Sequence, residues 1–371
     1  MKLSRFATSC LIAGMFTTNA YALEIDFSGF ASIVAGKTLG SDESFIADRT
    51  FGSVGTYDNE LSLRPESIVA LQAKAEVSEK VSATAQLLAK GQDQFDASFE
   101  WLYVTYRLTD ETAVNAGRFR MPFYYYSDFL DVGYAYYWVR PPIDVYNIGH
   151  TSLNGITLFD RRYFGDLGVS SQVWFGTDEV DLSGTNVDVR NDLGLTVTLE
   201  YDWAKVRFMH NRKRIVAQYT EDNRPGVGEV ELVDLDDMSY NAIAFIADYG
   251  NFLWRSEFTQ LKYTYNGVFH VASNIDAPIT SDEKQNAWYA SVGYNIGQFT
   301  PHYTYSYMDG SASMLAGDTD SNTVGVRWDL QPGMALKFEY SRQDSKELVA
   351  SGTTIPAAKS KLVTVAVDVV F

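Results

Sequence analysis

A hydrophobic pattern with a period of two residues runs along most of this chain. In the final segment Val363, Val365, Val367 and Val369 alternate with small or polar residues. Successive side chains of a β-strand point to opposite faces, so each such segment predicts a strand with one apolar and one polar face. The same alternation occurs in 67–77, 81–90, 192–201 and 321–330. These segments are about ten residues long, which is the length that a tilted strand needs to cross a bilayer.

The connections between these segments alternate between two kinds. Short turns are expected at 78–80, 109–112, 165–167, 202–204, 249–251, 297–299 and 331–333. Long polar loops are expected at 37–66, 91–96, 120–151, 177–190, 215–237, 264–283, 308–319 and 342–358. A soluble β-sandwich has no reason to keep every long loop at one end, whereas an outer-membrane barrel does. Because every backbone group must be paired in hydrocarbon, the sheet must also close. We therefore predict an all-β fold, a transmembrane antiparallel β-barrel of about 16 strands.

Aromatic residues cluster beside the expected short turns. They are Tyr201, Trp203, Tyr249, Phe252, Phe299, Trp328 and Phe371. Such a cluster is typical of the aromatic girdle at a membrane interface. The alternative explanation is that tyrosine and tryptophan simply favour strands.

One long segment, 118–146, fits neither a strand nor a solvated loop. It is rich in aromatic residues and also carries several arginines and aspartates. Pro122, Pro141 and Pro142 exclude one continuous helix through it. A loop of this length in a chain of short periodic segments is usually functional.

The N-terminal segment 1–22 reads as a secretory signal peptide. Lys2 and Arg5 precede an apolar run, and Ala20-Tyr21-Ala22 forms a small-x-small cleavage site. The alternative, a membrane-spanning helix, is disfavoured because the apolar run is well below the ~20 residues of a span. Cleavage leaves 23–371 as one barrel domain, changes the formal net charge from −17 to −19, and removes Cys10, the only cysteine. No disulfide or thiolate metal site would remain.

The strand at 24–36 directly after the signal, the long third loop at 120–151, and Phe371 after alternating valines make the chain resemble the sixteen-stranded porins of Gram-negative bacteria. The resemblance implies an outer-membrane homotrimer in contact with the lipid bilayer and lipopolysaccharide. It also implies that the third loop folds into the barrel and narrows it. Phe371 resembles the terminal signal that the barrel-assembly machinery recognises in this family.

A porin selects solutes by the radius of its pore and by the electric field inside it. Opposed charges at a constriction produce such a field and select ions. On the third loop the candidate constriction residues are Asp128, Asp131, Arg140 and Asp144. Strand parity gives the candidate pore-wall residues Arg107, Arg118, Arg120, Arg161, Arg207, Arg255 and Arg327. A charge on the lipid face at mid-bilayer costs about 2–4 kcal/mol, so arginines are expected to face inward. The alternative is that these arginines are ordinary solvated wall without a concerted role.

Two arginines after the loop, Arg161 and Arg162, are further candidates for anchoring it through its aspartates. Only one of them can point inward, since adjacent residues alternate faces. The loop aromatics either pack the loop against the inner wall or form a surface on which sugars stack. Acidic loops would concentrate cations at the mouth of the pore.

Other functional classes have little support in the sequence. The histidines His150, His210, His270 and His302 show no metal-ligand spacing, so we expect no metal site, no cofactor and no enzymatic activity. The negative charge argues against nucleic acid as a partner. The predicted function is a porin that passes small hydrophilic solutes and ions by diffusion. Alternatives are a sugar- or phosphate-selective channel, and a plugged barrel that serves as an adhesin or receptor.

Overall fold

The structure of the chain is a computed structural model. It describes residues 24–41, 43–48, 55–182, 185–219, 230–272, 275–309, 318–346, 348–350, 353–355 and 357–371. The expected signal peptide, 1–22, lies outside the described residues. Among the described residues no helix is long and apolar enough to cross a bilayer.

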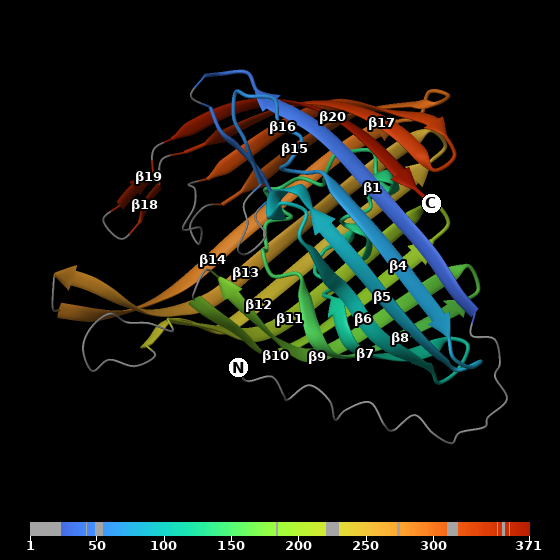
Figure 1. Ribbon diagram of the computed structural model, residues 1–371, viewed down its shortest axis with the longest axis horizontal. Coiled ribbons are helices and arrows are strands. Elements are labelled where there is room, and N and C mark those ends of the chain that lie inside the picture. Colours follow the sequence, from blue (N-terminus) through green and yellow to red (C-terminus); the bar gives the residue numbers. More distant parts are fainter. Residues whose placement is uncertain are drawn as a thin grey trace, which may run out of the picture.

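Sixteen antiparallel strands form one closed barrel (Figure 1). In chain order the barrel strands are β1 (Glu24–Thr38), β4 (Ile68–Glu76), β5 (Val81–Lys90), β6 (Ala97–Arg107), β7 (Thr112–Arg120), β8 (Ser152–Phe164), β9 (Leu167–Leu182), β10 (Thr185–Tyr201), β11 (Ala204–Tyr219), β12 (Val230–Tyr249), β13 (Phe252–Ala272), β14 (Ile275–Tyr294), β15 (Phe299–Met308), β16 (Thr319–Gln331), β17 (Met334–Ser345) and β20 (Ala358–Val370). Two small hairpins lie outside this ring, β2 (Phe45–Asp48) with β3 (Gly55–Tyr57), and β18 (Leu348–Ala350) with β19 (Thr353–Ile355). The prediction of a barrel of about 16 strands is confirmed.

Closure joins the first strand to the last. β1 pairs with β20 from Phe30 opposite Val370 to Thr38 opposite Leu362, and with β4 on its other side. Phe371 continues the seam, because its backbone exchanges two hydrogen bonds with Gly29 (2.7 and 2.9 Å). No barrel strand is therefore left with an unpaired edge, as a hydrocarbon environment requires.

All seven short turns occur where the sequence predicts them, each between two consecutive barrel strands. The predicted bounds of the long loops are partly wrong. The segment expected to be a loop at 264–283 is mostly strand, because β13 and β14 pair as far as Ala272 opposite Ile275. Likewise β9 and β10 continue into the expected loop 177–190. Residues 264–272 of β13 show no strict apolar alternation, whereas in β10 Val187 and Val189 do alternate with Asp188 and Arg190 and are buried.

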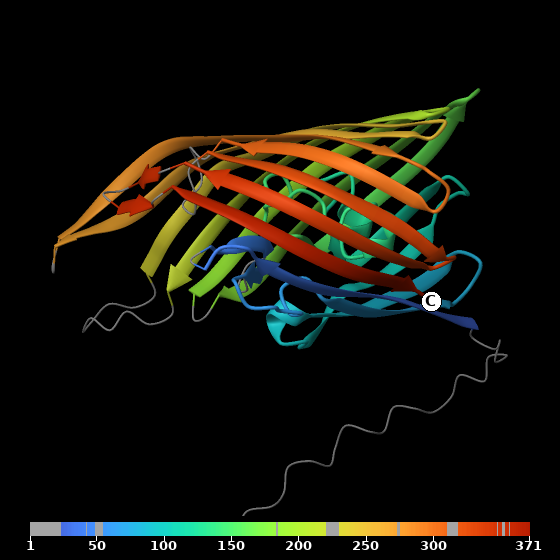
Figure 2. The same ribbon diagram turned by 90° about the horizontal axis from the view of Figure 1, so that it is seen from above.

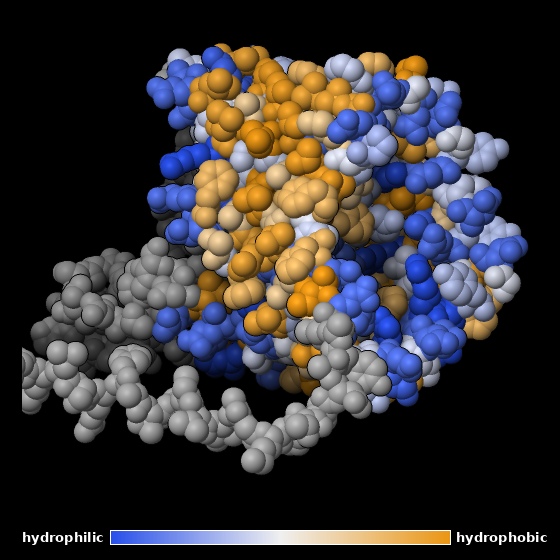
Figure 3. Space-filling model, turned by 45° about the vertical axis from the view of Figure 1, so that its right-hand side comes forward, coloured by the Kyte–Doolittle hydropathy of each residue, from blue (hydrophilic) through white to orange (hydrophobic). Residues whose placement is uncertain are grey.

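The two faces of the barrel wall follow the predicted parity. Leu71, Leu102, Phe208 and Val324 are 46–53% exposed on the outside. Figure 3 shows the apolar outer surface, with hydrophilic side chains on either side of it. Predominantly polar residues such as Gln86, Thr196 and Thr304 alternate with them and are buried. An apolar outside and a polar inside are what a barrel in lipid requires.

The aromatic residues beside the short turns point outward. Tyr201, Trp203, Tyr249 and Phe371 are 45–69% exposed. The Trp203 and Tyr249 rings contact each other edge to face, with centroids 5.8 Å apart. Outward exposure favours the girdle over a merely local strand preference.

Candidate functional site

The segment between β7 and β8, residues 121–151, is the candidate site; we call it the third loop. It contains two short 3-10 helices, η2 (Ser127–Phe129) and η3 (Gly133–Ala135). Figures 1 and 2 show this teal-to-green segment between the walls of the barrel. Its hydrogen bonds reach inward-facing residues of β7, β11 and β13–β17.

An aromatic core holds the loop against the wall. It comprises Phe119, Met121, Phe123, Tyr124, Tyr126, Tyr136, Tyr137, Trp138, Val145 and Tyr146 of the loop and its root, and Leu153, Trp174, Met209, Tyr240, Ala287, Tyr289 and Met308 of the strands. Tyr124 stacks on Tyr146 at 4.3 Å, and Trp138 meets Tyr289 edge to face at 5.7 Å. Ring pairs of this kind add stability beyond their buried area. Most of the loop aromatics in this core are therefore packed against the wall; Trp138, for example, is 1% exposed.

Glu257 of β13 joins the two ends of the loop. Its carboxylate accepts the Tyr125 backbone N–H (3.0 Å) and the Tyr146 hydroxyl (2.7 Å). Arg207 of β11 donates to the Pro122 carbonyl (2.8 Å). These contacts fix the loop near its beginning and near its end.

The middle of the loop is bonded to the opposite part of the wall. The Tyr137 hydroxyl donates to Ser291 (2.8 Å), and the Trp138 indole donates to Thr304 (2.8 Å). Arg327 of β16 donates to the carbonyl oxygens of Tyr134 (2.6 Å) and Tyr136 (2.8 Å). The loop is thus tied to wall strands on both sides of its aromatic core.

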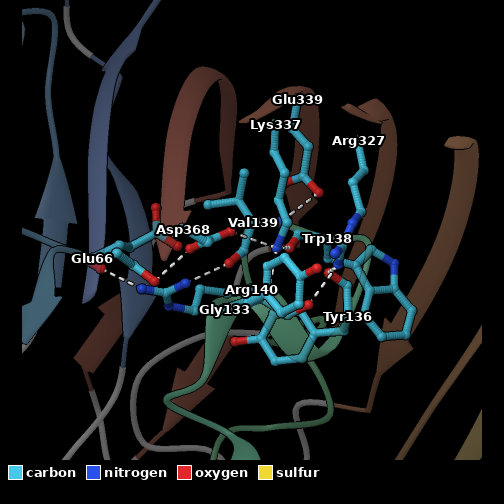
Figure 4. Close-up of polar contacts among 12 residues, drawn as sticks. Glu66, Gly133, Tyr136, Trp138, Val139, Arg140, Arg327, Lys337, Glu339 and Asp368 are labelled. Carbon is cyan, nitrogen blue, oxygen red and sulfur yellow. Dashed lines mark hydrogen bonds and ion pairs between the residues drawn. The ribbon is translucent and has the colours of Figure 1, made fainter. Parts of the chain in front are cut away.

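A buried charge network, shown in Figure 4, completes this attachment. Lys337 of β17 lies 2.8 Å from Asp368 of β20 and donates to the carbonyl oxygens of Gly133 (2.6 Å) and Trp138 (2.5 Å). Glu339 accepts the Val139 N–H at 2.8 Å. Each ion thus also binds groups of the loop or wall, as buried charges require.

Arg140 extends the same network toward β4. Its guanidinium donates to the backbone carbonyl oxygens of Glu66 (2.5 Å) and Val139 (2.6 Å). Arg140 therefore has a direct role in attaching the loop.

Asp131 lies at the root of the loop in a second ionic cluster. It contacts Arg120, which also binds Glu100 at 2.8 Å, and Lys90 lies 3.5 Å away. Burial alone would raise the pKa of Asp131, but Arg120 and Lys90 hold it well below its usual value. Because its pKa is lowered, Asp131 is charged at neutral pH. Its side chain is only 5% exposed, so this charge is withdrawn from the lumen.

The two remaining acidic residues of the loop differ in their exposure to solvent. Asp144 is fully buried and accepts hydrogen bonds from Ser306 (2.7 Å) and Gln343 (3.1 Å). Asp128 is exposed, and both it and Lys74 of β4 lie near the Tyr103 ring on the inner face of β6. Of the candidate constriction residues, Asp128 is the one with an exposed side chain.

Most candidate pore-wall arginines lie on the inner face. Arg107 pairs in register with Ala113. It lies on the face of β6 opposite to that of Val104 and Tyr106, which point outward, and it contacts Glu76 at 3.3 Å. Arg255 lies in register with buried Ile246 and Ser291 and contacts Asp248 at 2.5 Å. These arginines are paired with carboxylates or bonded to the loop, so they do not form a row of free positive charge.

Two arginines differ from the expectation. Arg118 pairs in register with Leu102, on the outer face, and binds Asp178 at 2.9 Å. Phe119 is the residue that points inward there, in register with buried Leu153. Arg161 faces inward near a short turn, but its partner is Glu200 (3.6 Å), whereas a loop aspartate was expected.

Sequence reasoning missed Glu257, Lys337, Glu339 and Asp368 as functional residues. Their only signal is strand parity, which places Lys337 and Glu339 on the face opposite Phe338. Parity predicts that such charges face the lumen, but it does not indicate which of them bind the loop.

We expect Asp131→Asn to lower the stability of the folded barrel at pH 7, by about 1–3 kcal/mol for one charge-assisted bond. A carboxyl whose folded pKa is depressed contributes stability that is present above its unfolded value, about 3.9, and is lost as pH falls further. The difference between wild type and variant should therefore shrink below about pH 4. Denaturant unfolding at pH 7 and pH 3 measures it. A difference that is equally large at both values would contradict this role of the charge.

Comparisons with known proteins define the class of fold. No family model matches the chain, and no curated protein matches it in sequence. Solved structures do match. OmpT of Vibrio cholerae is 11% identical, with a TM-score of 0.58 over 95% of this chain and 99% of that chain.

Two further structures give the same result. An anion-selective porin from Comamonas acidovorans is 13% identical, with a TM-score of 0.58 over 94% of this chain and 100% of that chain. The outer-membrane channel DcaP of Acinetobacter baumannii is 13% identical, with a TM-score of 0.58 over 96% and 99%. The chain therefore has the fold of the sixteen-stranded outer-membrane porins.

Proposed function

We propose that the protein is a porin, a water-filled outer-membrane channel through which small hydrophilic solutes and ions diffuse passively. The observation that carries this proposal is the closed barrel with an apolar outside and a polar inner wall, to which the third loop is hydrogen bonded. In an outer-membrane barrel a polar lumen that holds water lets hydrophilic solutes cross the apolar bilayer.

Single-channel recording of the purified mature protein in planar bilayers tests this proposal. We expect stepwise conductance in potassium chloride and a modest cation preference in a salt gradient. The absence of any conductance from folded protein would overturn the channel proposal. It would favour the second candidate, a plugged barrel acting as a surface adhesin or receptor.

The extent of the loop's attachment favours a narrow, selective form of the channel. The loop binds residues on both sides of the barrel, from Arg207 of β11 to Lys337 of β17. A narrow passage discriminates by size and charge more strongly than a wide one. Small conductance steps that a sugar or phosphate blocks would support this form.

Asp128 is the proposed selectivity residue of the loop. It is exposed, whereas Asp131 and Asp144 are buried and hydrogen bonded. We expect Asp128→Asn to lower the cation preference, because it removes a negative charge from the path. The reversal potential in a potassium chloride gradient measures this. Asp344→Asn, on the outer face of β17, is the matched control. An unchanged reversal potential in Asp128→Asn would remove Asp128 from the selectivity mechanism.

We also propose a homotrimer in the lipid bilayer, with lipopolysaccharide around it. An apolar groove on the outer wall supports a packed interface: small residues Ala73, Ala75, Ala83 and Ala85 lie beside Leu102. Small side chains let two walls approach closely. Conductance steps that close in threes would support the trimer.

Insertion by the barrel-assembly machinery is proposed through Phe371. Its ring is 69% exposed at the end of the closing strand. Export by the signal peptide 1–22 remains part of the same proposal.

A further inference from the structure

Three positively charged residues lie side by side on the outside of the barrel, near the long-loop ends of β1, β20 and β17. They are Lys37, Lys361 and Arg342, and all three are exposed. β20 lies between β1 and β17 (Figure 1). Lys361 is directly opposite Arg342, and Lys37 is opposite Val363, two residues along β20 from Lys361. We call these three residues the basic row. Diffusion through the lumen does not require charges on the outer face.

The alternation of exposed and buried residues assigns the basic row to the outer face. On β20 Lys361 and Val363 are exposed, whereas Leu362 between them is buried. On β17 Arg342 follows the exposed Tyr340 by two positions. Side chains two positions apart on a strand share a face, so the charges continue the apolar outer surface toward the loops.

The distance along β20 gives the level of the basic row in the membrane. Lys361 precedes Phe371, at the opposite end of the strand, by ten residues. At about 3.4 Å per residue and a tilt of about 35–45°, ten residues span ~24–28 Å along the membrane normal. The apolar band of such barrels is about 25 Å tall, so Lys361 lies at its upper edge.

Aromatic residues mark the same edge. Tyr340 of β17 is 37% exposed, and Tyr303 of β15 is 46% exposed. Both are opposite Val324 of β16, so they lie at one level, just below the basic row. Tyrosines of this kind occupy the interface between hydrocarbon and headgroups. The basic row therefore lies at the level of the lipid headgroups.

Arg342 is the member of the basic row that has a carboxylate partner. It contacts Asp344 at 2.7 Å, and Lys359 lies 3.8 Å from the same carboxylate. Asp320 is opposite Asp344 in the register. Two cations and two carboxylates thus balance at this end of the row.

Lys37 and Lys361 form the other end of the row. In the part of the chain that the structure describes, neither ammonium group makes an ion pair. Glu43 accepts the backbone N–H of Lys361 at 2.9 Å and does not pair with its ammonium group. An ammonium group has three hydrogens to donate, so both lysines can bind an anionic ligand from outside the chain.

We propose that the basic row binds the phosphorylated headgroup of lipopolysaccharide. Phosphate oxygens would accept charge-assisted hydrogen bonds from Lys37, Lys361 and Arg342. The acyl chains would lie on exposed apolar residues below the row, such as Ile33 and Val363. Basic clusters at a membrane surface attract anionic lipid headgroups. This inference deepens the proposed function by naming the site of a lipid partner, and it rests on that function only for the leaflet that the long loops face.

Other occupants fit less well. A neutral sugar headgroup would leave the two ammonium groups without a counter-charge. The basic row crosses three strands, which are about 4.8 Å apart, so it extends over roughly 10 Å. A headgroup that carries more than one phosphate matches this width better than the single phosphodiester of a phospholipid.

Native mass spectrometry of the purified protein in detergent tests the proposal. The ligand is the lipid anchor of lipopolysaccharide, and comparison ligands are the same lipid without its phosphates, phosphatidylglycerol and inorganic phosphate. We expect the phosphorylated anchor to bind at least about tenfold more tightly than each comparison ligand. The double variant Lys37→Gln with Lys361→Gln should weaken its binding by about tenfold or more. Both lysines are exposed, and circular dichroism checks that the barrel folds.

The double variant Lys80→Gln with Arg162→Gln is the matched control, because it removes two exposed positive charges from the short-turn end of the barrel. Its affinity should equal that of wild type. Equal binding of the lipid without phosphates, of phosphatidylglycerol or of inorganic phosphate would overturn the proposal, as would an equal loss in the control. A changed oligomeric state in Lys37→Gln with Lys361→Gln would assign the lysines to subunit packing and also overturn it.

Conductance separates this inference from the channel proposal. Stepwise conductance without a preference for the phosphorylated lipid would refute the lipid site and leave the porin function intact. Phosphate-dependent lipid binding without conductance would refute the channel and retain the site.

Discussion

Replacing residues 123–146 with a short glycine–serine linker is expected to raise the single-channel conductance several-fold. A sixteen-stranded barrel without an internal loop leaves a wide aqueous channel. In this protein the loop lies within that space and carries most of the aromatic core. Removing it should leave a passage bounded by the inner wall alone.

We expect the barrel of this variant still to fold, so that its conductance can be measured. The barrel strands are hydrogen bonded to one another around the full ring, and that pairing does not depend on the loop. Planar-bilayer recording in potassium chloride measures the change. Deleting the β18–β19 hairpin, which pairs only with itself, is the control and should leave conductance unchanged. If the loop deletion conducts no better than the control, the loop does not limit the pore.

The wall of the barrel was predictable because its signal is repeated and local. Leu71 outside and Gln72 inside follow from the two-residue period, and each hairpin repeats that test. The short turns are equally local, and Gly165, Gly250, Gly297 and Gly333 occupy them with positive φ. Errors appear where the apolar alternation stops, as in residues 264–272 of β13, which remain paired with β14.

The loop contacts could not be predicted in the same way. Asp128, Asp131 and Asp144 are alike in sequence, yet one is exposed, one is paired with Arg120, and one is bonded to Ser306. Their partners lie on strands as distant in sequence as β15 and β17. Only the three-dimensional path of the loop decides which acid meets which wall residue.

Arg118 lies on the outer face although the cost of a charge in lipid predicts that arginines face inward. A lipid-facing charge is costly at the middle of the bilayer, but the cost falls to about 0–1 kcal/mol near the interfaces. Arg118 lies two residues before the end of β7 and has Asp178 as a partner, so it avoids most of that cost. Arg120, two residues further on, is 6% exposed and binds Asp131 of the loop, so strict alternation does not extend to the end of β7.

Lys337→Met is expected to destabilise the folded barrel by about 3–5 kcal/mol, the range for removing one partner of a buried ion pair. The side chains of Lys337 and Asp368 are both 0% exposed. The substitution leaves the Asp368 carboxylate buried with only the Ser32 hydroxyl bond (2.5 Å). It also deprives the loop carbonyl oxygens of Gly133 and Trp138 of their donor.

Equilibrium unfolding of the protein in lipid vesicles with guanidinium chloride measures this loss. Lys346→Met is the control: its lysine is 72% exposed and pairs with Asp318 at 3.0 Å, so it should cost about 0–1 kcal/mol. In the double variant Lys337→Met with Asp368→Val no charge is left unpaired, so the combined loss should be clearly smaller than the sum of the single losses. A Lys337→Met loss no larger than that of Lys346→Met would show that the buried pair does not attach the loop to the wall.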